Sequence, residues 1–221
     1  MAKPILYIGN KNYSSWSMRP WLALKWGGID FDERVIPLGG PGYGKSQIAE
    51  ILAVSPSGRV PALHDGAIAI HDSLAISEWA AERAPSLWPS DPGARALARA
   101  ASAEMHSSFF ALRRDLSMNI KRRVAKEPDW PEDTRADFAR LFELWGDALQ
   151  RSGGPWLFGA RSITDAMYAP VVTRLRTYAV ETPASLQPYC DALLNDGAFR
   201  DWERGALAET WAIPSTDELY R

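Results

Sequence analysis

"SGRVPALHDGAIAIHDSLAISEW" (residues 57–79) joins three local signals: a strand that opens on proline, a hairpin and a helix start. Asp65-Gly66 separates two short apolar runs, as the turn of a β-hairpin does. Pro61 opens the first strand, where proline fits only in special geometry, and a cis Val60–Pro61 bond is one candidate. An ordinary proline on an edge strand is the alternative. The stretch therefore predicts a hairpin followed by a helix.

Asp72 and Ser73 mark the start of that helix, which ends before Pro85. The unpaired N–H groups and the dipole of a helix N-terminus suit a carboxylate, and the Asp72 carboxylate suits an ammonium. Before a cis proline, the N–H and C=O of Val60 point out of the sheet and could hold a peptide-like ligand as an added strand. A ligand with a free α-amino acid end and a peptide bond would satisfy both sites. Capping alone is the other explanation of Asp72 and Ser73.

The sequence before this stretch alternates between strand and helix patterns. A buried strand is predicted at 5–9, and a helix at 17–28 with Pro20 in its first turn and two glycines at its end. A second strand follows at 31–38, and a second helix at 45–55 ends before a proline. The predicted order up to the helix after the hairpin is β-α-β-α-β-β-α.

The sequence after it reads as helical throughout. A Pro-, Ser- and Gly-rich segment predicts a linker at 85–93, between an α/β domain (1–84) and an all-α domain (94–221). Apolar residues from Leu97 to Leu116 mark one face of a long helix, and those from Phe138 to Leu149 mark another. Ser162-x-x-Asp165 resembles a capping box, and we assign both residues wholly to structure. The fold class is therefore α/β plus all-α.

Composition excludes several classes of function. The chain has 221 residues, a net charge of −2 and no long basic block, so we expect no nucleic-acid partner. No run approaches the roughly 18 apolar residues of a membrane span. Cys190 is the only cysteine, so an internal disulfide is excluded, which fits a protein of the reducing cytoplasm. We expect Cys190 itself to be buried and to pack as a small hydrophobic side chain. Three scattered histidines offer no metal-ligand spacing, and some of the ten tryptophans are expected to line an apolar pocket.

At this point the chain resembles the glutathione S-transferases. "VPAL" (60–63) is similar to their cis-proline element, "DSLAISEW" (72–79) to their motif for the γ-glutamyl end of glutathione, and "SITDA" (162–166) to their box in the helical half. The resemblance covers essentially the whole chain. It implies a thioredoxin-like domain followed by a helical bundle, a homodimer, and glutathione as co-substrate, bound by Val60, Pro61, Asp72 and Ser73.

"SSWSMRPWLAL" (14–24) resembles the zeta-class pattern S-S-C-x-W-R-V-R-I-A-L. The resemblance implies that Ser14 donates a hydrogen bond to the glutathione sulfur and favours the thiolate, with Ser15 as the alternative. Both serines could instead be helix caps. Trp16 stands where the zeta enzymes have cysteine, which puts their isomerase activity in question. Without cysteines here, the protein itself cannot carry out dithiol exchange.

Further residues are candidates for the mouth of the site. "GGPGYGKS" (39–46) predicts a flexible loop, where Lys45 could pair with the glycine carboxylate of glutathione or be a solvated surface charge. His106, Phe110 and Arg113 recur at helical spacing and could line a pocket for the second substrate. The alternatives are an interhelix histidine and surface charges.

The resemblance implies an enzyme, a cytoplasmic glutathione transferase that uses the thiolate of glutathione to attack a small, apolar electrophile, without a metal. Glutathione-dependent isomerisation or ether cleavage would use the same thiolate. A non-catalytic protein of the same fold, which binds a partner or an apolar ligand, is the alternative from another class.

Overall fold

The computed structural model describes residues 3–219 and contains a four-stranded mixed sheet in the order β2-β1-β3-β4. β1 runs parallel to β2 and antiparallel to β3, which pairs antiparallel with β4. The strands are β1 (Ile5–Ile8), β2 (Asp32–Val35), β3 (Ala62–Asp65) and β4 (Ile68–His71). The hairpin is confirmed, with Asp65 as the last residue of β3 and Gly66 at a positive φ in the turn.

Helices α1 (Ser15–Trp26), α2 (Ala49–Leu52) and α3 (Ser73–Arg83) complete the predicted β-α-β-α-β-β-α order. Two details of the prediction are wrong. The side chain of Ser14 caps α1, so the helix starts earlier than expected and Pro20 lies in its second turn. The predicted helix at 45–55 is a single turn, because the glycine-rich loop before it extends as far as Ile48.

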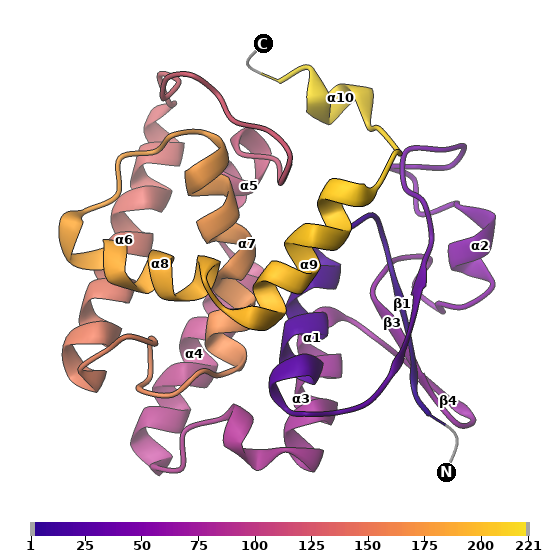
Figure 1. Cartoon of the computed structure of the whole chain (residues 1–221), viewed down its shortest axis with the longest axis horizontal. Helices are drawn as coiled ribbons and strands as arrows, with labels where there is room; N and C mark the ends of the chain where they lie inside the picture. Colours follow the sequence, from indigo (N-terminus) through magenta and orange to yellow (C-terminus); the bar gives the residue numbers. More distant parts are fainter. Residues whose placement is uncertain (1–2, 220–221) are drawn as a thin grey trace.

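The rest of the chain is helical, as predicted. It contains η1 (Pro85–Leu87), α4 (Pro92–Ser107), α5 (Phe110–Asp115), α6 (Glu132–Ser152), α7 (Ile163–Thr177), η2 (Ala184–Leu186), α8 (Gln187–Leu194), α9 (Gly197–Ala208) and α10 (Pro214–Asp217). Figure 1 shows the sheet and α2 on one side, the bundle of α4 to α8 on the other, and α1 with α9 between them. α4 begins inside the segment predicted as a linker.

The single long helix predicted around residues 97–116 is wrong. Ser108 is extended and Phe109 adopts a left-handed conformation with a φ of 57°, so the helix divides into α4 and α5. The side chain of Phe109 is buried, whereas Leu97, predicted on the same apolar face, is 49% exposed. The break redirects the chain after His106, the residue that faces the sheet domain.

The core runs through both parts of the molecule. α1 packs against α3, α7 and α9, and its Met18 and Leu22 are fully buried. Ser162 and Asp165 form the predicted capping box at the start of α7. Burial raises the pKa of Asp165 to about 6, although its carboxylate accepts hydrogen bonds from Leu157 and Ser162. Cys190 is buried, as expected, and burial raises its thiol pKa.

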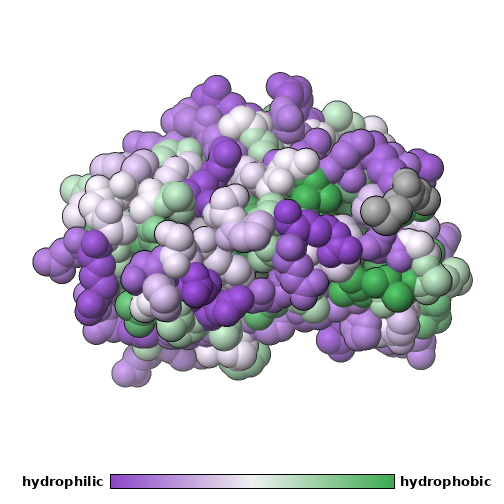
Figure 2. All heavy atoms as spheres, turned by 90° about the horizontal axis from the view of Figure 1, so that it is seen from below, coloured by the Kyte–Doolittle hydropathy of each residue, from purple (hydrophilic) through white to green (hydrophobic). Residues whose placement is uncertain are grey.

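The surface is mostly hydrophilic, with separate apolar areas between charged side chains on the face shown in Figure 2. Ile68 on β4 and Leu97 on α4 are among the large apolar side chains that are about half exposed. Within residues 3–219, none of the helices has the length and hydropathy that crossing a membrane requires.

Candidate functional site

Two cavities lie where the sheet domain meets the helices, and Trp16 belongs to the wall of both. The first cavity has a volume of about 300 Å³ and is lined by Trp16, Val60, Pro61, Asp72, Ser73 and His106, among others. The second cavity has a volume of about 390 Å³, and its walls include Tyr13, Ser14, Ser15, Trp16, Tyr43 and Val60. The residues predicted from the sequence, namely Ser14, Ser15, Pro61 and Asp72, therefore lie around one composite site.

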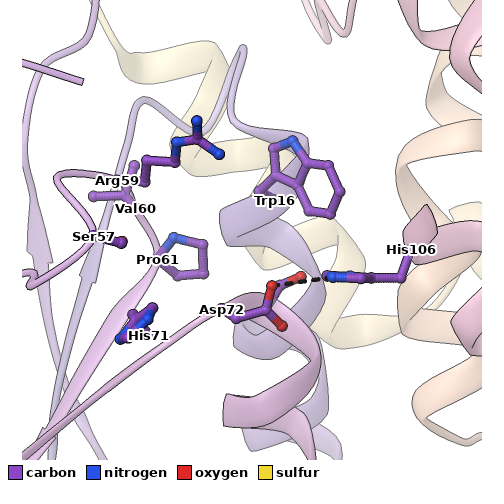
Figure 3. A pocket seen from close by; sticks show the side chains of 9 residues that line it. Trp16, Ser57, Arg59, Val60, Pro61, His71, Asp72 and His106 are labelled. Atoms are coloured by element: carbon purple, nitrogen blue, oxygen red, sulfur yellow. Dashed lines mark ion pairs between the residues drawn. The ribbon is translucent and has the colours of Figure 1, made fainter. Parts of the chain in front are cut away.

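Val60 is one of three residues that the two cavities share, with Trp16 and Arg59. The Val60–Pro61 peptide bond is cis, as the sequence suggested, and Pro61 immediately precedes β3. Both residues face the first cavity in Figure 3. The backbone of Val60 thus lies at the passage from one cavity to the other, where a peptide-like ligand could extend along it.

Asp72 is the N-cap of α3 and has a φ of 77°. A positive φ at a non-glycine residue costs on the order of 1 kcal/mol, and such residues cluster at functional sites. Its Oδ1 accepts hydrogen bonds from the N–H groups of Leu74 (2.8 Å) and Ala75 (3.2 Å). Its Oδ2 lies 3.1 Å from Nε2 of His106. The hydroxyl of the next residue, Ser73, is buried and has no hydrogen-bond partner in the protein.

Ser14 is the N-cap of α1, and its side chain is almost completely buried. Its hydroxyl donates to Oγ of Ser17 over 2.7 Å, and it accepts the N–H of Ser17 at 3.4 Å. Oγ of Ser17 in turn accepts the N–H of Gly9 at 3.1 Å. A small polar network therefore fixes the hydroxyl of Ser14 at the wall of the second cavity.

Ser15 contacts a buried arginine that is not among the residues predicted from the sequence. Arg174 of α7 donates from Nη2 to Oγ of Ser15 over 3.1 Å. Burial, with the charge of Arg113 nearby, lowers the pKa of Arg174 to about 10. Arg19 of α1 is fully buried, and none of its guanidinium nitrogens has a hydrogen-bond partner in the protein. Burial and the charges of Arg174 and Arg113 lower its pKa well below the ordinary value.

These arginines form a cationic cluster behind Trp16. The guanidinium carbon of Arg19 lies 4.2 Å from the centre of the Trp16 ring, and that of Arg113 lies 5.4 Å from it. Buried cations without carboxylate partners are rare because the loss of hydration is expensive. The sequence signal for Arg19 was its place beside the apolar residues of the middle of α1, from Met18 to Leu24, all of which are buried.

The other predicted residues are placed less centrally. Lys45 is exposed, and the loop contributes its neighbours Gly44 and Ser46 to the second cavity instead. Phe110 is 73% exposed and does not line either cavity. Arg113 reaches back to the carbonyl of His106 over 3.3 Å and contacts Trp16 from behind the wall. His106 joins the first cavity, opposite Pro61 (Figure 3).

Comparison with known proteins agrees with this geometry. Residues 13–83 match the family model "Glutathione S-transferase, N-terminal domain". The chain is 31% identical over 192 residues to maleylacetoacetate isomerase from Rattus norvegicus, an alignment that covers 85% of this chain and 83% of the relative. The chain belongs to the glutathione S-transferase family. The predicted thioredoxin-like domain and helical second half are confirmed as the fold of this family.

Solved structures of glutathione transferases align along nearly the whole chain. A theta-class glutathione S-transferase from Xanthomonas axonopodis pv. citri with glutathione bound superposes with a TM-score of 0.65 at 25% identity, covering 96% of this chain and all of the other. A Burkholderia glutathione transferase homolog, also with bound glutathione, superposes with a TM-score of 0.70 at 24% identity, over 95% of this chain and all of the other. This second likeness concerns the fold alone.

Residues 3–219 contain no group of three or more histidine, cysteine or acidic side chains placed to hold a metal ion. The polar groups on the cavity walls are instead hydroxyls, one carboxylate, two imidazoles and the guanidinium of Arg59. This set suits a zwitterionic organic ligand.

Proposed function

We propose that this protein is a glutathione transferase in which Ser14 stabilises the thiolate of bound glutathione for attack on a small electrophile. One observation carries the proposal: the hydroxyl of Ser14 and the carboxylate of Asp72 line two adjoining cavities that share Val60. Glutathione is a tripeptide with a thiol near its middle and an α-amino acid group at one end. A ligand of this kind would extend along Val60 from one cavity to the other.

In this arrangement each predicted residue binds one part of glutathione. The carboxylate of Asp72 holds the α-ammonium group, and the unpartnered hydroxyl of Ser73 at the start of α3 meets the α-carboxylate. The backbone of Val60, held by the Pro61 element, pairs with the central peptide. Lys45 lies on the exposed loop, between two residues that line the second cavity. From this position its ammonium group pairs with the glycine carboxylate.

Ser14 acts on the sulfur and does not itself attack. A thiol has a pKa of about 8.5, so lowering it by about two units makes it mostly ionised at neutral pH. A hydroxyl donor at the N-terminus of α1 stabilises the thiolate by hydrogen bonding and by the helix dipole. The sulfur lone pair then forms the carbon–sulfur bond, while a halide leaves an aromatic substrate or the carbon of an activated alkene gains a proton from water.

A glutathione-dependent isomerase is the second candidate, and two observations favour it. Two relatives with 31% identity are named maleylacetoacetate isomerase, and the substrate in that name is a carboxylate anion. The guanidinium nitrogens of Arg19, together with Nε and Nη1 of Arg174, have no hydrogen-bond partner in the protein, and the charge of these buried arginines favours an anion nearby. Addition of the thiolate to a conjugated double bond would allow rotation, and its departure would restore glutathione. Trp16, where the zeta pattern has cysteine, distinguishes this chain from those enzymes.

The deciding experiment titrates the ultraviolet absorbance of the thiolate of glutathione bound to the wild type, Ser14→Ala and Ser15→Ala. We expect a thiol pKa well below that of free glutathione in the wild type and a return toward the free value in Ser14→Ala alone. If Ser15→Ala shows the return instead, Ser15 is the donor. Binding with an unshifted thiol would favour a non-catalytic binding protein, and no binding would overturn the proposal.

We also propose a cytoplasmic homodimer whose sheet domain (1–84) and helical domain (94–221) meet at the site. The half-exposed apolar side chains of Ile68 and Leu97 support an association between copies. Light scattering of the purified protein tests the dimer, and Leu97→Glu should lower the measured mass if α4 forms the contact.

A further inference from the structure

The contact between Asp72 and His106 joins the two halves of the molecule inside the first cavity. Asp72 starts α3 of the sheet domain, and His106 lies in the last turn of α4 in the helical part. Figure 3 shows the two side chains pointing toward each other, with Nε2 and Oδ2 3.1 Å apart. From the sequence, we expected Asp72 in the subsite for glutathione and His106 in the subsite for the second substrate.

The two oxygens of Asp72 have different tasks. Oδ1 accepts two backbone N–H groups of α3, at 2.8 and 3.2 Å, and is held by the helix. Oδ2 is therefore the oxygen with capacity for a cation in the first cavity. Among the residues that line this cavity in the described chain, Asp72 is the one carboxylate. Any ammonium bound there must share Oδ2 with His106.

His106 is held rigidly on its other sides. Its ring stands edge-on to Trp16, with centroids 5.3 Å apart at 79°. The guanidinium of Arg113 donates to its backbone carbonyl over 3.3 Å, and a further bond from Arg113 to Ser108 fixes the end of α4. An ionised carboxylate only accepts hydrogen bonds, so Nε2 of His106 carries the ring proton. The Nε2–H group donates a hydrogen bond to Oδ2 of Asp72. Nδ1 is buried without a partner, so the ring contributes one bond, and that bond goes to Asp72.

We propose that His106 is a positioning residue for the α-amino group of glutathione: it fixes Oδ2 of Asp72 in the orientation that accepts the ammonium. The inference rests on the proposed binding of glutathione. It also means that the helical domain completes the recognition of the γ-glutamyl end, although every residue that contacts this end belongs to the sheet domain. Discrimination for the amino group, rather than binding in general, is what His106 controls.

The test compares two ligands that differ only in the ammonium: glutathione and glutaryl-cysteinyl-glycine, which lacks the α-amino group. Calorimetry gives the ratio of their dissociation constants for the wild type, Asp72→Asn, His106→Ala, His106→Gln and Ser107→Ala. Ser107 is the matched control, since its exposed hydroxyl bonds only to Ala103 within α4. Thermal unfolding of each variant reports general damage to the fold.

We expect the wild type to prefer glutathione and Asp72→Asn to lose that preference. His106→Ala should reduce the preference about three- to tenfold, the usual effect of one hydrogen bond. His106→Gln, which retains an N–H donor, should restore most of it, and Ser107→Ala should leave it unchanged.

Four results would overturn the inference, and they differ from one another. If His106→Ala weakens both ligands equally, His106 acts only on the shape of the cavity. If Asp72→Asn loses the preference and His106→Ala keeps it, Asp72 binds the ammonium without help from His106. If the wild type binds glutathione without preferring it to the analogue, the ammonium site itself is wrong, whereas absence of glutathione binding refutes the proposed function as well.

Discussion

The hydroxyl of Ser14 donates a hydrogen bond to the hydroxyl oxygen of Ser17, which lies 2.7 Å away and is fully buried. In this state the hydroxyl proton of Ser14 points toward Ser17 and away from a ligand in the second cavity. Hydroxyl hydrogens rotate freely, so the bond can reverse: Ser17 then donates to Ser14, and Ser14 donates to the glutathione sulfur. The N–H of Gly9 satisfies Ser17 in both states. Ser17 therefore supports the donor without contacting the ligand.

Replacing Ser17 by alanine should separate this support from the donor itself. We expect a smaller rise in the pKa of the bound thiol than in Ser14→Ala, because Ser14 keeps its proton but loses the oriented partner. The N–H of Gly9 is left without an acceptor, which costs about 1–3 kcal/mol of unfolding free energy. Urea unfolding and the thiolate titration measure the two effects. A bound-thiol pKa equal to that of the wild type would show that Ser14 needs no relay.

Replacing Arg19 by methionine tests the cationic cluster. Removing a fully buried, unpartnered charge should raise the unfolding free energy by about 1–4 kcal/mol. Because Arg19 lies behind Trp16 and lines neither cavity, its charge acts on the site at a distance, so the same change should raise the KM for a carboxylate-bearing electrophile about two- to threefold more than that for a neutral one. Arg204→Met on α9 is the control, since Arg204 is exposed and pairs with Asp201. Equal losses with both electrophiles would mean that the cluster does not select anions.

Glu209 holds the loop that precedes Ser14, and we expect its replacement to affect catalysis. Its carboxylate accepts the N–H groups of Lys11 (2.6 Å) and Asn12 (3.0 Å). Glu209→Ala leaves both donors unpaired, so we expect a loss of about 1–3 kcal/mol in unfolding free energy and a lower kcat with glutathione saturating. Glu218→Ala is a suitable comparison. An unchanged kcat in a destabilised Glu209→Ala protein would limit Glu209 to a structural role.

Asp165 should make stability depend on pH. Burial raises its pKa in the folded state to about 6, above the ordinary value of 3.8, so the folded state binds the proton more tightly than the unfolded chain does. The contribution of Asp165 to the unfolding free energy is fully present below pH 4 and is lost as the pH rises through 6. The total loss is about 3 kcal/mol. Raising the pH from 4 to 6 should therefore lower the unfolding free energy of the wild type relative to that of Asp165→Asn, whose side chain does not ionise. A constant difference would place the folded-state pKa at its ordinary value.

The sequence predicted those parts of the site whose signals are local. The proline before β3, the acidic cap of α3 and the serine at the start of α1 each show in a few neighbouring residues, and the structure brings all three to adjoining cavities. Arg174 contacts Ser15 from 159 positions away, so only the fold could reveal the pair. The break at Phe109 was missed because apolar spacing continues through it, although the backbone there turns left-handed.

The loop from Asn10 to Tyr13 has a consequence for how the protein is made. Its hydrogen bonds reach Asn119, Glu209 and Asp217, and the bond between Lys11 and Glu209 spans 198 residues. Contacts between such distant positions form late, since the entropy of closing the loop precedes any gain. Residue 217 must therefore leave the ribosome before the segment next to Ser14 can complete its native hydrogen bonds. A nascent chain with its first domain already outside the ribosome would still lack the hydrogen bonds that hold this segment in place.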